Sequence, residues 1–237
     1  MVKQKILLAF ALLLLSCLLA GCFNELWYIQ RALEYHSLSK VNPKALVFRY
    51  ELNDKDEAVI IGLHGRKHDN GYEGGQFDLN IPSEVDKYKV TAIDDFAFYN
   101  CCNLLSVTIT EGVTSIGEHA FEDCSSLRSV NFPDTLINIG GHAFASCNLK
   151  SIIIPNSVTS IGWYAFSDNP NLKSVTIPKS VVEIGFLLDD NRNKYYVDGV
   201  GIFDNYNNNK DLIIYTPKGS HADSYAKKNN IKVEYIK

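Results

Sequence analysis

Residues 97–117 read AFYNCCNLLSVTITEGVTSIG, and residues 120–140 repeat the same pattern as AFEDCSSLRSVNFPDTLINIG. The Ala-Phe pair that opens both stretches recurs at Ala143-Phe144 and Ala165-Phe166, so the successive spacings are 23, 23 and 22 residues. Self-similarity at a period of roughly 20–29 residues is typical of proteins that stack one coil on the next.

Within each copy, a segment of the form L-x-x-V-x-I predicts a short strand with one face buried. An Ile-Gly pair closes each copy, where glycine allows a turn that a side chain would block. One copy alone cannot bury its apolar face, so we expect stacked coils that share a single core. Besides Ala-Phe, the recurring positions are Cys101, Cys124, Cys147 and Asn169; Leu104, Leu127, Leu149 and Leu172; and Ile116-Gly117, Ile139-Gly140, Ile161-Gly162 and Ile184-Gly185.

The string L-x-x-V-x-I-P-x-x-V-x-x-I-G-x-x-A-F-x-x-C resembles the BspA-like, or treponemal-type, leucine-rich repeat over roughly residues 79–237. The resemblance implies a β-rich leucine-rich-repeat solenoid of stacked parallel rungs, with a 22–23-residue period, an N-terminal hairpin cap and a C-terminal helix cap. It also implies surface adhesion, because members of the family are associated with binding host matrix proteins and with co-aggregation. Asn169 in place of Cys, and one residue missing after Cys147, are expected to alter only the local curvature.

The chain is expected to divide into five segments. These are a lipoprotein signal peptide over 1–21, an anchor or linker over 22–45, an N-terminal β cap over 46–89, leucine-rich repeats over 90–203 with a hairpin insert near 186–200, and the last rung with the C-terminal cap over 204–237.

Both ends of the repeats look capped. Leu46–Leu52 and Ala58–Leu63 predict a hairpin, followed by a first rung at Phe77–Pro82. In the insert, Asp198-Gly199 predicts a tight hairpin turn, after which Ile202-Phe203 stands where Ala-Phe would. A closing helix is predicted to begin at Ser220 with Asp223 in its first turn, and Ile231–Tyr235 is predicted to cover the last sheet edge.

The first 22 residues resemble a bacterial lipoprotein leader. Lys3 and Lys5 precede an apolar run that is too short to span a bilayer as a helix of about 20 residues. The run ends in Leu19-Ala20-Gly21-Cys22, which resembles the lipobox and predicts lipidation at Cys22. Several acyl chains would give a durable membrane anchor, and Phe23 permits sorting to an outer membrane.

The charge balance and the absence of known catalytic motifs argue against nucleic-acid binding and catalysis as functions of this sequence. The sequence has 23 Lys and Arg against 27 Asp and Glu, so no basic excess is available for a nucleic acid backbone. It carries no G-x-S-x-G, H-E-x-x-H, phosphate-binding loop or C-x-x-C motif. We therefore expect a protein that binds rather than catalyses, with no cofactor.

Two sets of residues are candidate ligand-binding positions. The first consists of outward positions on the predicted strands, which should form columns about 4.8 Å apart from rung to rung. These are Ser106, Ser129, Ser151 and Ser174, and Thr108, Asn131, Ile153 and Thr176. A solvated sheet face is the competing interpretation.

The second set lies two residues before each core Phe and would form a stripe of rings. It consists of Phe96, His119, His142 and Tyr164, with Trp163 beside the last. The stripe is either a patch for a partner or a row of rings folded back onto the coils. His119 and His142 with Glu118 or Glu122 fall short of any recognised zinc spacing, so no metal site is expected.

The remaining cysteines, Cys101, Cys124 and Cys147 with Cys102 adjacent, are expected to be buried thiols, although one disulfide stays possible in an exported protein. The sequence as a whole predicts a lipid-anchored envelope protein that adheres to host or neighbouring-cell proteins. One alternative is a periplasm-facing scaffold for other envelope proteins. Another is a glycan or small-molecule binder, which would need a concave polar pocket.

Overall fold

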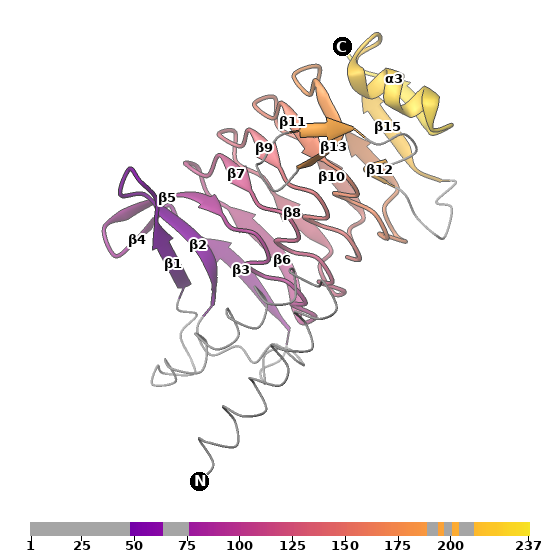
Figure 1. Cartoon of the computed structure of the whole chain (residues 1–237). Coiled ribbons are helices and arrows are strands. Elements are labelled where there is room, and N and C mark those ends of the chain that lie inside the picture. Colours follow the sequence, from indigo (N-terminus) through magenta and orange to yellow (C-terminus); the bar gives the residue numbers. More distant parts are fainter. Residues whose placement is uncertain (1–47, 64–75, 189–193, 197–200, 204–210) are drawn as a thin grey trace, which may run out of the picture. The chain divides into compact units, whose positions relative to one another are not determined.

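The computed structural model describes residues 48–63, 76–188, 194–196, 201–203 and 211–237 (Figure 1). The chain divides into two units, residues 1–46 and 47–237, and every described residue belongs to the second. The predicted leader, Cys22 and the linker therefore lie outside the described residues.

The second unit begins with the predicted hairpin. Strands β1 (Phe48–Leu52) and β2 (Ala58–Leu63) pair antiparallel across a five-residue polar turn. The side-chain oxygen of Asn53 closes the turn by accepting hydrogen bonds from the backbone nitrogens of Lys55 and Glu57. Strand β2 then pairs parallel with β5 (Tyr88–Ile93), which itself forms a short hairpin with β4 (Glu84–Val85). The hairpin thus starts the stack of coils, as a cap should.

Each repeat contributes two short parallel strands, one to each side of the stack (Figure 1). The L-x-x-V-x-I segments form one side and the segments around Ile-Gly form the other, in register from coil to coil. The first side consists of β3 (Phe77–Ile81), β6 (Leu104–Ile109), β8 (Ser129–Asn131), β10 (Ser151–Ile153), β12 (Ser174–Thr176), β15 (Ile213–Thr216) and β16 (Lys232–Tyr235). The second consists of β5, β7 (Ser115–Ile116), β9 (Asn138–Ile139), β11 (Ser160–Gly162) and β13 (Glu183–Leu188). The predicted solenoid of parallel rungs is confirmed.

A stack of phenylalanine rings runs through the core. The rings of Phe98, Phe121, Phe144 and Phe166 are buried and nearly parallel, with centroids 5.0, 5.1 and 5.7 Å apart. Phe203 continues the stack 5.9 Å from Phe166, which confirms that Ile202-Phe203 replaces the Ala-Phe pair. Because each ring packs between its two neighbours, no coil has a complete core by itself.

The glycine of each Ile-Gly pair is required by close stacking. A Cβ on Gly140 would lie 2.5 Å from the carbonyl carbon of Gly117, and one on Gly162 would lie 2.4 Å from the nitrogen of Gly141. Backbone therefore passes directly over backbone at this corner, and any side chain would force the coils apart.

The C-terminal end holds the last rungs and the closing helix. Strand β13 pairs antiparallel with β14 (Lys194–Tyr196), while the predicted Asp198-Gly199 turn lies outside the described residues. Strand β16 pairs parallel with β15, so it covers the edge of β15 as predicted and is itself the edge strand of this sheet. The closing helix is confirmed as α3 (His221–Lys228), with Ser220 as N-cap accepting from the Asp223 backbone nitrogen at 3.0 Å.

The residue missing after Cys147 changes the hydrogen bonding of its coil and interrupts one sheet. In the other coils the Leu nitrogen donates to the carbonyl of the residue three positions earlier, as Leu127 does to Cys124 at 2.8 Å. Leu149 is only two residues from Cys147, and its nitrogen donates instead to the side chain Oδ1 of Asn169 in the next coil, at 3.0 Å. The first side of the stack splits at the same place, into the sheets β3-β6-β8 and β10-β12-β15-β16. The missing residue after Cys147 and the Asn169 that stands in place of Cys are therefore parts of one structural feature.

Candidate functional site

The outward positions of the first side form the predicted columns, which we call the strand face. Ser106 pairs with Ser129 across β6 and β8, and Ser151 pairs with Ser174 across β10 and β12. Thr108 and Asn131 are exposed neighbours, with the Asn131 amide donating to the Thr108 hydroxyl at 3.5 Å. The sequence predicted these columns correctly, although Ser106, Ser174 and Thr176 are only half-exposed.

Ile153 stands out on the strand face. Its side chain is 72% exposed, the highest value among the large hydrophobic residues that are exposed in the described part of the chain. It pairs with Thr176 on the neighbouring strand, and the other outward positions of these two strands carry small polar side chains. A single exposed aliphatic side chain on a flat polar sheet is a suitable contact point for a partner.

A row of cations borders the strand face, and the sequence reasoning missed it. Arg128, Lys150 and Lys173 occupy the same repeat position in consecutive coils and all three are exposed. The backbone nitrogen of Lys173 donates to the backbone carbonyl of Lys150 at 3.0 Å, so these two residues are direct neighbours. None of the three makes an ion pair with another residue that the structure describes. Aligning the repeat copies for charge as well as apolarity would have revealed the row.

The predicted ring stripe exists on the turn side of the coils, and we call it the turn ladder. Phe96 stacks on His119 with centroids 4.5 Å apart, and His119 stacks on His142 at 4.8 Å. Trp163 meets His142 edge-on at 4.4 Å and Tyr164 lies beside both. All five rings are half-buried. The rings therefore cover much of one another's surface, in a ladder of one ring per coil.

The backbone explains why the ladder is so regular. Phe96, His119, His142 and Tyr164 all have positive φ, between 49° and 57°. Four residues further along each coil, Asn100, Asp123, Ser146 and Asp168 repeat this left-handed conformation. Non-glycine residues adopt it at a cost, which the surrounding coil-to-coil hydrogen bonds offset. These two left-handed positions per coil were not predicted from the sequence.

Glu122 joins the two histidines of the ladder. Its Oε2 lies 2.6 Å from Nδ1 of His119, and its Oε1 lies 3.4 Å from Nδ1 of His142, an ion-pair distance without hydrogen-bond alignment. Burial by itself would raise the pKa of Glu122, but the hydrogen bond with His119 and the nearby His142 outweigh it and lower the pKa to about 2. The carboxylate is thus held ionised between two imidazoles.

The cysteines are confirmed as free thiols. Cys101, Cys124 and Cys147 are buried and Cys102 is half-buried, with no disulfide among them. The thiols of Cys124 and Cys147 donate to the carbonyls of Phe98 and Phe121 in the preceding coil, at 3.3 and 3.2 Å. Burial raises the pKa of the Cys147 thiol well above its usual range, so it is a packing group and not a nucleophile.

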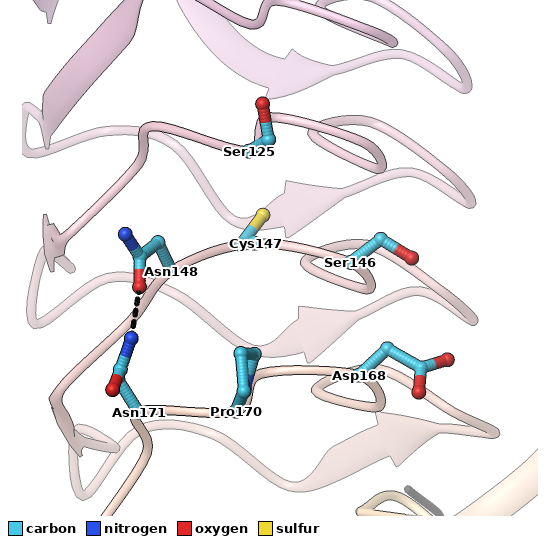
Figure 2. A pocket seen from close by; sticks show the side chains of 7 residues that line it. All are labelled: Ser125, Ser146, Cys147, Asn148, Asp168, Pro170 and Asn171. Carbon is cyan, nitrogen blue, oxygen red and sulfur yellow. Dashed lines mark hydrogen bonds between the residues drawn. The ribbon is translucent and has the colours of Figure 1, made fainter. Parts of the chain in front are cut away.

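A hollow of about 470 Å³ lies beside the shortened coil (Figure 2). It is lined by Ser125, Ser146, Cys147, Asn148, Asp168, Pro170 and Asn171. Figure 2 shows Ser146 and Asp168 on one side, while the side chains of Asn148 and Asn171 bind each other at 2.6 Å on the other side. Since its polar groups do not converge on one point, the hollow does not favour the glycan-binding alternative.

Stacked parallel rungs around a shared core, with the repeat's Leu and Ile side chains inside, define a leucine-rich-repeat protein. Residues 91–188 match the family described as BspA type Leucine rich repeat region, in six copies. This chain belongs to that family. Within the described ranges, no helix is long and apolar enough to cross a bilayer.

Two leucine-rich-repeat proteins are among the solved structures that are similar to this chain. A leucine-rich-repeat protein of T. pallidum is 29% identical, with a TM-score of 0.54 over 71% of this chain and 68% of that one. A leucine-rich repeat protein from Bacteroides capillosus is 30% identical and matches over 56% of this chain and 94% of that one, with a TM-score of 0.44. No curated protein matches the sequence significantly.

Proposed function

We propose that this chain is a lipid-anchored cell-envelope protein whose strand face binds other proteins, in adhesion to host or neighbouring-cell proteins. The observation that carries the proposal is Ile153, which is 72% exposed among the small polar side chains of the strand face. Repeat proteins commonly bind through such continuous surfaces, and an apolar contact point within a polar surface is typical of protein interfaces.

The cation row defines the chemistry of the partner. Arg128, Lys150 and Lys173 present positive charge along one border of the strand face, in a chain whose net charge is −4. A partner with acidic side chains beside an apolar pocket would match both features, and complementary charge speeds the encounter and sets the register. The anchor at Cys22 would hold this face at the cell envelope.

The strand face and the ladder contribute differently under this proposal. The outward side chains of Thr108, Asn131 and Ile153 are exposed, whereas His119 and His142 keep about a fifth of their side-chain surface accessible. We therefore assign the main contact to the strand face. The turn ladder, including Phe96, Trp163 and Tyr164, stays a secondary candidate.

The test compares substitutions on the two sides of the stack. Cells that display the Ile153→Ser, Lys150→Ser double variant are measured for adhesion to surfaces coated with extracellular-matrix proteins. Losing an isoleucine contact of about 1.5–3 kcal/mol reduces affinity by roughly 10- to 100-fold, and loss of the lysine adds to this. Ile137→Ser with Val182→Ser is the matched control, because both side chains are exposed hydrophobics, at 41% and 49%, on the other side of the coils.

Equal adhesion of the two variants would contradict the assignment of the strand face. If cells with the unaltered chain do not adhere, while crosslinkers placed near Ile153 capture other envelope proteins, the scaffold alternative replaces adhesion.

A further inference from the structure

Two histidines and a glutamate come together on the turn ladder although they belong to different coils. His119 and His142 hold the same repeat position in consecutive coils, and their rings stack with an angle of 11° between them. Glu122 follows His119 by three residues and lies against both Nδ1 atoms. The ligand atoms of the three side chains all lie within 4.8 Å of one another.

One of these atoms is left without a hydrogen bond. Nδ1 of His142 is buried and makes no hydrogen bond with any described residue, although it faces Glu122 at 3.4 Å. A buried imidazole nitrogen without a hydrogen bond is unusual, and a bound ion is one of the arrangements that satisfies it. The nearby carboxylate supplies the negative charge that a cation requires.

The distances are near those of a metal site. Tetrahedral zinc, with metal–ligand bonds of about 2.0–2.2 Å, separates its ligand atoms by roughly 3.3–3.5 Å. The His142–Glu122 distance of 3.4 Å already fits this value. The His119–Glu122 distance of 2.6 Å is that of a hydrogen bond, so the carboxylate must rotate to admit an ion. Because an imidazole binds a metal ion in its own ring plane, the two rings must also turn out of their nearly parallel stack until both Nδ1 atoms point at the ion.

Neighbouring rings hold the ligands at the surface of the coils. Phe96 covers the outer face of the His119 ring, and the edge of Trp163 meets His142 from the other side. The side chains of His119, Glu122 and His142 are 22%, 19% and 19% exposed, so the turn of the rings that aims the buried Nδ1 of His142 at the ion also opens it to solvent and to a water ligand. Three protein ligands plus an open position is the pattern of non-structural zinc sites.

We propose that Nδ1 of His119, Nδ1 of His142 and the carboxylate of Glu122 bind a divalent first-row transition metal ion of the Zn²⁺ type, with water in the remaining position. The ion takes the place of the proton between Nδ1 of His119 and Glu122, and the neutral ring then carries that proton on Nε2, so the proton count of the site does not change. Two neutral imidazoles and one carboxylate leave a net charge of +1 at the occupied site. This proposal does not depend on the proposed adhesion function.

The experiment titrates the purified full chain with ZnCl₂ in an isothermal calorimeter, using a buffer that does not chelate. We expect saturable binding of Zn²⁺ that weakens at least about 10-fold in His142→Asn and in Glu122→Gln. Asparagine is chosen because it tolerates the positive φ of this position. His221→Asn is the matched control, since His221 is exposed on α3 far along the chain, and its Zn²⁺ affinity should equal that of the unaltered chain.

A second measurement locates the ion. Cu²⁺ quenches tryptophan emission at short range, and Trp163 lies 4.4 Å from His142 by ring centroids. We expect quenching that Trp163→Phe removes and His142→Asn reduces. Absence of Zn²⁺ binding, or equal Zn²⁺ affinity in His142→Asn, Glu122→Gln and the unaltered chain, would overturn the proposal.

Discussion

The coupling between the shortened coil and Asn169 yields a counterintuitive prediction. Asn169→Cys restores the repeat pattern, because Cys stands at this position in the three preceding coils. We nevertheless expect it to destabilise the chain. The Asn169 amide donates to the Phe144 carbonyl at 2.8 Å, and its oxygen accepts from the Leu149 nitrogen at 3.0 Å, all in the buried interior.

The expected loss follows from these two bonds. A cysteine thiol can still donate to the Phe144 carbonyl, as Cys147 does to Phe121, but it cannot accept from Leu149 with comparable strength. A buried N–H left without an acceptor costs about 1–3 kcal/mol. We therefore expect the free energy of unfolding to fall by about 2 kcal/mol, which lowers Tm by roughly 4–8 °C in a domain of this size.

The assay is urea unfolding followed by far-UV circular dichroism, with a compensating insertion as control. Inserting Ser between Asn148 and Leu149 gives the coil the same length as its neighbours, so that Leu149 can donate within its own turn. In that background Asn169→Cys should cost at least about 1 kcal/mol less than it does alone. Equal costs in the two backgrounds, or no loss in the single variant, would refute the coupling.

Three further predictions concern the turns and their charges. Ser146→Gly should raise the free energy of unfolding by about 0.5 kcal/mol, because Ser146 has a φ of 53° that glycine adopts without strain. Ser125 has no positive φ, so Ser125→Gly should lower the free energy of unfolding by a similar amount; chemical denaturation measures both variants. The pKa of Glu122 is lowered from 4.5 to about 2, so its stabilising contribution is complete above pH 4.5 and is lost as pH falls towards 2. The stability difference between the unaltered chain and Glu122→Gln, about 2 kcal/mol at pH 5, should therefore vanish near pH 2, and a constant difference would contradict the pKa. In the native chain, a thiol reagent should modify Cys102 well before the three buried thiols, so Cys102→Ser should remove one fast-reacting group.

The repetitive part of the fold was predictable because every copy carries the same pattern of apolar, aromatic and glycine residues. Alternating apolar residues, a core Phe and a glycine where backbones cross recur in register, and their agreement leaves one way to stack the coils. The same register placed the outward columns and the turn ladder correctly. Only the pairing of particular side chains between coils, such as Asn169 with Leu149, was out of reach of the pattern.

The features that escaped prediction depend on contacts between coils or on the backbone conformation of single residues. Glu122 drew attention only as a possible metal partner, because its contact with His142 depends on the distance between coils, which no sequence spacing reports. The left-handed residues were missed because phenylalanine, tyrosine and serine do not signal that conformation, and histidine, asparagine and aspartate signal it only weakly compared with glycine.

Protease shaving of intact cells, followed by detection of residues 47–237 with an antibody, distinguishes adhesion from a role inside the envelope. An adhesion protein anchored at Cys22 presents its strand face outside the cell, so we expect prompt loss of the antibody signal from intact cells. Protection of the signal until the outer layer is permeabilised would contradict adhesion and would leave the scaffold inside the envelope as the remaining account.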